Sequence, residues 1–275
     1  MNSTTAPSTT TRTVTLATRL GPVEVTMTER GHGRPFLLLH GGAGPASVSA
    51  FADLLAGSRG ARVITPIHPG FGGTPRPAAL DSMTGLAAVY SALLDELELA
   101  DVTVVGNSIG GWIAAELALL ANPRVGRVVL VDAVGLQIDE HPIVDFFALT
   151  MAEVTDRSYF EAERFRINLD TLPARAKAAM AGNRVALEVY GGTTMCEPTL
   201  RGRLPGIASP TLVVWGAADR VVSPEHGQAY ADAIPGARLD LIETAGHLPQ
   251  VETPQRLLDD VWAFTTVAEV RTGRP

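Results

Sequence analysis

A serine in a glycine-rich segment is the first residue of this 275-residue chain whose type and setting could do chemistry. Ser108 stands in G-N-S-I-G-G, between the apolar run Val102–Val105 and a pattern typical of a helix. A G-x-S-x-G match alone arises by chance in about one chain of this length in ten, so its setting matters more. A sharp turn from strand to helix raises a serine hydroxyl above a sheet and points a helix N-terminus at it. The sequence therefore predicts Ser108 as a nucleophile, against the alternative of an ordinary glycine-rich turn.

Two further residues have the types that activate a serine. Asp219 follows the apolar run Leu212–Trp215 and the small residues G-A-A, and His247 follows the next strand-like run. A histidine can take the serine proton while an acid orients it, and the order serine, acid, histidine is one known order for such a triad. Asp132 follows another apolar run and is an alternative acid. Asp219 is favoured because its small-residue loop can bring a carboxylate beneath the histidine.

A glycine-rich loop, His40–Gly44, follows the apolar run Phe36–Leu39. Backbone N–H groups in such a loop can stabilise an oxyanion. We expect the N–H groups of Gly42 and Ile109 to serve in this way. A dinucleotide loop is the alternative, but the segment lacks G-x-G-x-x-G and no acid follows about twenty positions later at a strand end.

The elements that would position these residues follow from hydrophobic patterning. Continuous apolar runs are typical of parallel strands buried on both faces. They lie at Phe36–Leu39, Val63–Ile64, Val102–Val105, Val128–Val131, Leu212–Trp215 and, with mixed polarity, Leu239–Ile242. Helical patterns separate most of them, as at Leu86–Leu97 and Ile109–Leu120. Two alternating runs, Thr11–Thr18 and Val23–Arg30, come first and predict an antiparallel hairpin. The fold class expected is α/β, with a mostly parallel, doubly wound sheet.

The stretch between Asp132 and Pro210 interrupts the alternation, since it contains no convincing strand. A structureless loop of that length is implausible in a compact domain, so residues 135–204 are predicted to form an inserted helical lid. Residues 14–134 and 205–275 would form the core, and residues 1–13 a disordered tail. The aromatic residues of the lid and a histidine at a strand end are expected to contact substrate; these are Phe146, Phe147, Tyr159 and His68.

Composition excludes several classes of function. Hydrophobic residues make up 46% of the chain and charged residues 19%, and the net charge is −7. This balance is that of a globular protein, and the negative charge argues against nucleic acid or an anionic membrane as partner. Cys196 is the only cysteine, which excludes an intrachain disulfide and a cysteine zinc site and fits a cytoplasmic location. No apolar run is long enough for a membrane span.

From about Gly31 to Phe264 the chain resembles the α/β-hydrolase superfamily. The matching segments are His40–Gly44, H-P-G-F-G at 68–72, Gly106–Gly111, Trp215–Asp219 and Gly246-His247. The resemblance implies the α/β-hydrolase fold, a triad of Ser108, Asp219 and His247, and an oxyanion hole at Gly42 and Ile109. The mechanism it implies needs no metal, nucleotide or organic cofactor.

The expected activity is acyl transfer to water on an ester, thioester or lactone of a modest apolar acid, with a small molecule as substrate. Asn107 and His40-Gly41-Gly42 also resemble the meta-cleavage product hydrolases, which cleave carbon–carbon bonds. Those enzymes commonly carry tryptophan after the catalytic histidine, where this chain has Leu248. A non-catalytic ligand receptor on the same scaffold is a further alternative.

Overall fold

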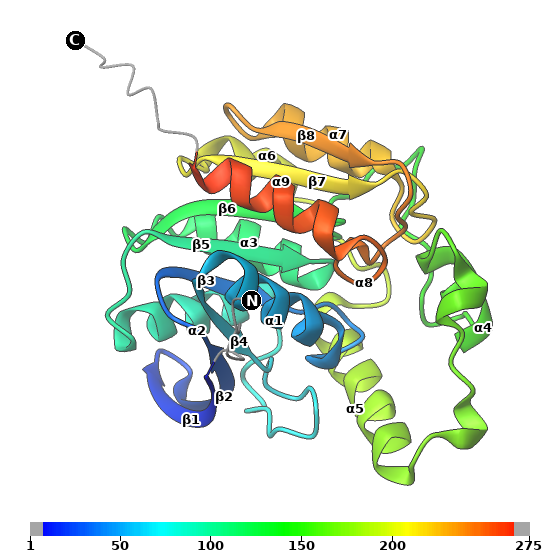
Figure 1. Cartoon of the computed structure of the whole chain (residues 1–275), viewed down its shortest axis with the longest axis horizontal. Helices are drawn as coiled ribbons and strands as arrows, with labels where there is room; N and C mark the ends of the chain where they lie inside the picture. Colours follow the sequence, from blue (N-terminus) through cyan, green and yellow to red (C-terminus); the bar gives the residue numbers. More distant parts are fainter. Residues whose placement is uncertain (1–7, 267–275) are drawn as a thin grey trace, which may run out of the picture.

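The computed structural model describes residues 8–266, which form an eight-stranded sheet covered on both faces by helices (Figure 1). The strand order is β1-β2-β4-β3-β5-β6-β7-β8. The pairs β1–β2 and β2–β4 are antiparallel and the remaining pairs are parallel. The strands are β1 (Thr9–Thr18), β2 (Gly21–Arg30), β3 (Arg34–Leu39), β4 (Ala61–Pro66), β5 (Val102–Asn107), β6 (Val125–Val131), β7 (Thr211–Gly216) and β8 (Arg238–Ile242). The mostly parallel, doubly wound sheet predicted from the apolar runs is confirmed.

Helices form a layer on each face of the sheet. The α-helices are α1 (Ala46–Arg59), α2 (Met83–Glu96), α3 (Ile109–Leu119), α4 (Met151–Ser158), α5 (Ala174–Gly191), α6 (Leu200–Arg203), α7 (Pro224–Ala233), α8 (Pro249–Glu252) and α9 (Pro254–Thr266). Short 3-10 turns are η1 (Ala162–Phe165), η2 (Leu169–Thr171) and η3 (Leu204–Gly206). Residues of α2, α3 and α7 share one apolar core, and residues of α1 and α9 share the other.

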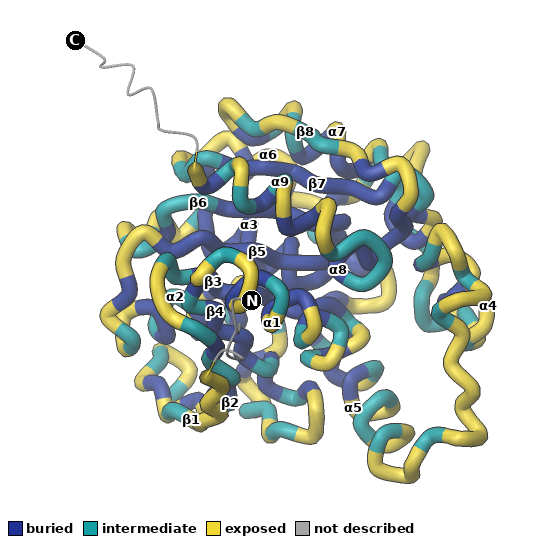
Figure 2. Tube along the Cα trace, viewed as in Figure 1, coloured by how far each residue is buried: buried dark blue, intermediate teal, exposed yellow. Residues whose placement is uncertain are grey.

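The central strands have a sequence that suits burial on both faces. Every residue of β5 and β7 is buried, and Figure 2 shows both strands enclosed between the helical layers. Because each strand is covered by helices on both faces, its side chains need to be apolar on both. Within residues 8–266 no helix is long and apolar enough to cross a bilayer.

The N-terminal hairpin is confirmed, but the predicted extent of the disordered tail is wrong. Of residues 1–13, the first seven lie outside the described residues, and β1 begins at Thr9. Threonine is polar, which favoured a tail, yet it is β-branched and suits an edge strand. Across the hairpin the hydroxyls of Thr13 and Thr26 are 2.8 Å apart. This cross-strand pair compensates for the lack of apolar burial at the start of β1.

The segment between β6 and β7 contains α4, α5 and α6 with their 3-10 turns. Its helices α4 and α5 lie beyond the carboxyl ends of β5 and β7, at the right of Figure 1. Its two ends meet at a bridge between Gly135 and Cys196, where the Glu197 N–H donates to the Gly135 carbonyl at 2.8 Å. We call residues 135–204 the inserted segment. Its role as a lid stays a prediction.

The close approach of the backbones of α3 and β3 can be tested by mutation at the start of α3. A Cβ on Gly110 would lie 2.3 Å from the Leu39 carbonyl oxygen, because α3 packs directly on the end of β3. We expect Gly110→Ala to lower the free energy of unfolding by about 3 kcal/mol. Gly57→Ala in α1 is the matched control, since a Cβ there meets nothing within 4 Å. It should raise stability by about 0.5 to 1 kcal/mol. Denaturant melts of both variants check this, and equal effects would contradict it.

Candidate active site

Ser108 occupies the sharp turn between β5 and α3. Its φ of 57° and ψ of −118° lie outside the regions that a serine ordinarily adopts. The Ser108 N–H donates to the Val131 carbonyl at 2.9 Å, and its own carbonyl accepts from the N–H of Gly111 at 3.0 Å. A Cβ on Gly106 would lie 2.0 Å from the Gly110 carbonyl oxygen. The turn therefore requires glycine at that position, as the motif predicted.

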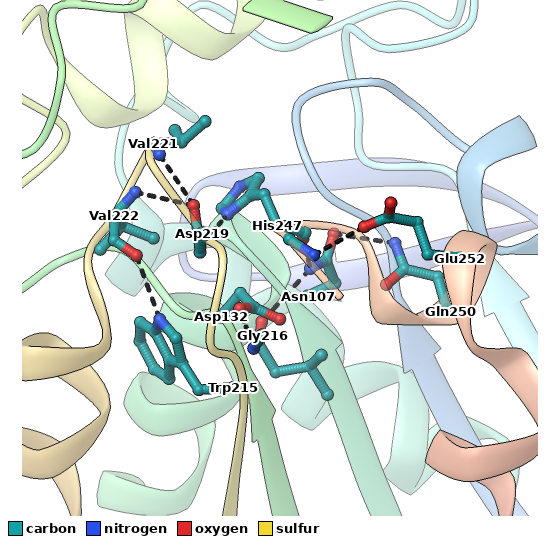
Figure 3. Close-up of polar contacts among 12 residues, drawn as sticks. Asn107, Asp132, Trp215, Gly216, Asp219, Val221, Val222, His247, Gln250 and Glu252 are labelled. Carbon is teal, nitrogen blue, oxygen red and sulfur yellow. Dashed lines mark hydrogen bonds and ion pairs between the residues drawn. The ribbon is translucent and has the colours of Figure 1, made fainter. Parts of the chain in front are cut away.

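His247 and Asp219 form a hydrogen-bonded pair near this turn (Figure 3). The His247 Nδ1 lies 2.7 Å from the Asp219 Oδ2. The other carboxylate oxygen of Asp219 accepts from the N–H groups of Val221 at 2.8 Å and Val222 at 3.1 Å. These donors hold the carboxylate in one orientation, so the imidazole is fixed with its Nε2 directed away from the acid.

Asp132 lies beside this pair, but its carboxyl group is held differently. An oxygen of Asp132, an oxygen of Asp219 and a ring nitrogen of His247 all lie within 4.8 Å of one another. One oxygen of Asp132 accepts from the Gly216 N–H at 2.8 Å, and the other has no partner in the described chain. Burial, and then the charge of Asp219, hold the pKa of Asp132 well above its ordinary value. Asp132 therefore keeps its proton where a free aspartate would lose it.

The loop His40–Gly44 is held by two buried histidines. The His68 N–H donates to His40 Nε2 at 3.1 Å, so the His40 proton is on Nδ1, which donates to the Gly41 carbonyl at 2.8 Å. His68 Nε2 in turn donates to the His40 carbonyl at 2.8 Å, and the Tyr90 hydroxyl donates to His68 Nδ1. Burial lowers the pKa of His40 to about 4 and that of His68 well below its usual value. Both rings therefore stay neutral across the physiological pH range and hold the loop by hydrogen bonds.

The prediction that His68 contacts substrate is wrong. Its side chain is fully buried behind the loop, with both ring nitrogens engaged. It does not line the cavity described below. The strand-end position that suggested substrate contact instead directs the ring into the core.

Two backbone N–H groups next to Ser108 are available. Gly42 lies in the loop after β3, and Ile109 is the first residue of α3. Within residues 8–266 no hydrogen bond engages either N–H. A free N–H at a helix N-terminus favours negative charge. The N–H groups of Gly42 and Ile109, which are predicted to bind an oxyanion, are therefore free to donate hydrogen bonds.

A cavity of about 250 Å³ opens over Ser108 and His247. The loop His40–Gly44, the residues around Asn107 and the inserted segment form its walls. Phe146 and Tyr159 line it, as the sequence led us to expect, and the Tyr159 ring stacks on Phe165 with centroids 4.6 Å apart. Phe147 is not among the lining residues, and its ring, like that of Phe146, packs on the core and on the Arg184 guanidinium, so its contact with substrate stays a prediction. Adjacent residues of an irregular segment face different ways, which composition could not reveal.

The comparisons with known proteins agree with this arrangement. Residues 34–254 match the sequence profile described as the alpha/beta hydrolase fold. The chain belongs to the α/β-hydrolase family. A 2-hydroxy-6-oxo-2,4-heptadienoate hydrolase of Pseudomonas putida is 28% identical over 88% of this chain and 94% of its own. Lipase 3 of a Moraxella species is 28% identical over 84% of this chain and 77% of its own.

Solved structures show the same fold. A meta-cleavage product hydrolase from Pseudomonas fluorescens superposes with a TM-score of 0.74 at 25% identity, covering 91% of this chain and 96% of its own. A thermophilic esterase from Thermogutta terrifontis superposes with a TM-score of 0.73 at 24% identity, covering 92% and 97%. This α/β hydrolase is therefore similar to proteins of more than one named activity.

The sequence analysis assigned no positioning role to three polar residues of this α/β hydrolase. Asn107 donates through Nδ2 to the His247 carbonyl at 2.9 Å and accepts at Oδ1 from Gln250 at 3.0 Å (Figure 3). Asn183 of α5 donates to the Ala43 carbonyl at 3.3 Å. Arg184, beside it, is the one side chain with a fixed charge among the described residues that line the cavity. Asn107 stood in the motif itself, whereas nothing local marked the other two.

The raised pKa of Asp132 predicts how the stability of the protein depends on pH. Because its folded pKa is raised, the wild-type protein loses stability as pH rises from the unfolded pKa of about 4 toward the folded value. Asp132→Asn is neutral at every pH and keeps an acceptor for the Gly216 N–H. Its stability relative to wild type should therefore grow with pH, by at most about 1.4 kcal/mol per unit. Denaturant midpoints between pH 5 and 8 measure this, and a variant that weakens steadily instead would show that Asp132 is ionised.

Proposed function

We propose that this α/β hydrolase is a serine hydrolase that cleaves its substrate through an acyl-enzyme. One observation carries the proposal. Ser108 and His247 face the same cavity, and the ring of His247 is fixed by Asp219 on its opposite side. A hydroxyl on a strained turn, a histidine and an orienting carboxylate are the parts of a nucleophilic triad.

The mechanism follows from the positions of these groups. His247 Nε2 takes the proton of the Ser108 hydroxyl as its oxygen attacks the substrate carbonyl. The N–H groups of Gly42 and Ile109 stabilise the negative oxygen of the tetrahedral intermediate. The intermediate expels the leaving group, which receives the proton from His247. Water, deprotonated by His247, then attacks the acyl carbon, and the acid is released with the proton returned to Ser108.

The cavity supports an ester, thioester or lactone of a modest apolar acid as substrate. Aliphatic and aromatic side chains dominate its lining, among them Phe146, Leu187 and Val221. A volume of about 250 Å³ holds an acyl group of modest size and excludes a long lipid chain lying wholly inside. A lid role for the inserted segment is part of this proposal, because that segment supplies most of the apolar wall.

A second candidate function is hydrolysis of a carbon–carbon bond next to a ketone in a carboxylate-bearing substrate. Arg184 favours it, since a lone cation in an apolar cavity suits a carboxylate. The Pseudomonas putida relative carries the name of a dienoate hydrolase. Against it, Arg184 already donates to the Phe147 carbonyl and lies over the Phe146 and Phe147 rings. The position after His247 is Leu248, not tryptophan. A panel of p-nitrophenyl esters, lactones and a dienoic diketone separates the two candidates.

The triad proposal is tested at its own residues. A fluorophosphonate probe should label the wild type and leave Ser108→Ala unlabelled. Ser108→Ala and His247→Ala should each reduce kcat about 10⁶-fold, with the double variant scarcely worse, because the residues act as a unit. Asp219→Asn should cost up to about 10⁴-fold in kcat, and Asp132→Asn far less. A protein that binds ligands but leaves the probe unreacted would be a receptor and not an enzyme.

Specificity is tested by a neighbouring pair of aromatic residues. Phe146 lines the cavity and Phe147 does not, although both lie in the same turn. Phe146→Ala should change KM and the preference among acyl chain lengths, with little loss of stability. Phe147→Ala should lower Tm and leave the preference unchanged. Steady-state kinetics on a series of p-nitrophenyl esters measures this, and identical specificity changes in both variants would contradict it.

A further inference from the structure

The carboxylate of Glu252 contacts two segments that are far apart in the sequence. Its Oε2 accepts from the Gly246 N–H at 2.6 Å, next to His247. Its Oε1 accepts from the N–H groups of Phe160 at 2.8 Å and Glu161 at 3.2 Å, just after α4. Glu252 is the last residue of α8, and Figure 3 shows it on the side of His247 opposite to Asp219. One side chain thus joins the inserted segment to the histidine loop.

Backbone contacts bring the same two segments together. The His247 N–H donates to the Ser158 carbonyl at 2.7 Å. A Cβ on Gly246 would lie 2.4 Å from that carbonyl oxygen and 3.0 Å from the Tyr159 Cα. Because only glycine allows this approach, the loop before His247 and the end of α4 fit as two backbones in direct contact.

The loop of the acid is joined to the same place. The N–H of Arg220, the residue after Asp219, donates to the Arg157 carbonyl at 3.1 Å. Its guanidinium donates to the carbonyls of Asp156 and Tyr159. The end of α4 is therefore bonded to the loops of both His247 and Asp219, while Tyr159 within it lines the cavity.

We propose that Glu252 is a positioning residue that fixes the end of α4 and the His247 loop relative to one another. The placement of the imidazole and of the substrate-facing wall at Tyr159 is then set by one carboxylate. Charge-assisted hydrogen bonds to three N–H groups are strong enough to hold such a junction. The inference rests on the proposed role of His247 as the base. Reaction rates are sensitive to its placement, since a displacement of about 1 Å can cost about 10²-fold.

The experiment compares three variants. Glu252→Gln keeps the size of the side chain, but its single carbonyl oxygen serves one segment while its amide group faces an N–H of the other. Glu252→Ala removes both connections. Glu243→Gln is the matched control, because Glu243 is an exposed acid in the connection from β8 to α8 and makes no hydrogen bond or ion pair within residues 8–266.

We expect kcat on a p-nitrophenyl acetate to fall roughly 10-fold in Glu252→Gln and up to about 100-fold in Glu252→Ala. KM should change by less than about two-fold, since the acetyl group is too small to depend on the Tyr159 wall. Amide hydrogen exchange should rise together in residues 156–161 and 246–248. Glu243→Gln should match the wild type in every measurement.

Two results would overturn the proposal. If Glu252→Gln lowers Tm while kcat per folded protein stays at the wild-type value, the carboxylate is structural only. If exchange rises in one segment and not the other, Glu252 does not couple them. Failure of the proposed function looks different, because then the wild type itself is not labelled at Ser108, and the exchange measurement still tests the junction.

Discussion

The backbone conformation of Ser108 is the constraint on which the rest of the site depends. A serine with positive φ is costly and persists only where its surroundings determine it. Here the register of β5 on β6 supplies the Val131 carbonyl that holds the Ser108 N–H, and α3 packs so closely on β3 that Gly110 allows no side chain. The sheet and α3 therefore hold the Ser108 hydroxyl in one position. The loops at the neighbouring strand ends are positioned by the same sheet.

Around Ser108, the buried aspartates and histidines differ in whether they are charged or neutral. Asp219 receives N–H donors on one oxygen and the imidazole on the other, so its negative charge is compensated. Asp132 has one such donor and, within residues 8–266, an oxygen without a partner, and burial holds its pKa well above the ordinary value. His40 and His68 are buried as neutral rings. His247 differs from both of these histidines, because its Nδ1 is paired with the Asp219 carboxylate.

The sequence predicted the fold well because its signals were local. Continuous apolar runs, the Ser108 turn and the chain order of Ser108, Asp219 and His247 all follow from strands that end at one edge of a sheet. The first residues of β1 were assigned to the disordered tail because threonine is polar, although it also favours strands. His68 was misplaced, and Phe147 does not line the cavity, because the direction of a side chain at a strand end or in an irregular segment depends on tertiary packing. Asn183 and Glu252 act on residues distant in the chain, and no pattern near them reveals a partner.

These distant contacts explain how an irregular segment can form a defined wall. The inserted segment is largely exposed in its middle, around η1 and η2 (Figure 2), so it gains little from apolar burial there. Hydrogen bonds hold the segment to neighbouring loops. Asn183 accepts from the Gly72 N–H at 2.8 Å and donates to the Ala43 carbonyl in the loop His40–Gly44, and Ser158 accepts from the His247 N–H. These bonds join the inserted segment to the loop His40–Gly44 and to the loop of His247, and not to its own exposed middle. The wall of the cavity and the loops around Ser108 are therefore parts of one hydrogen-bonded structure.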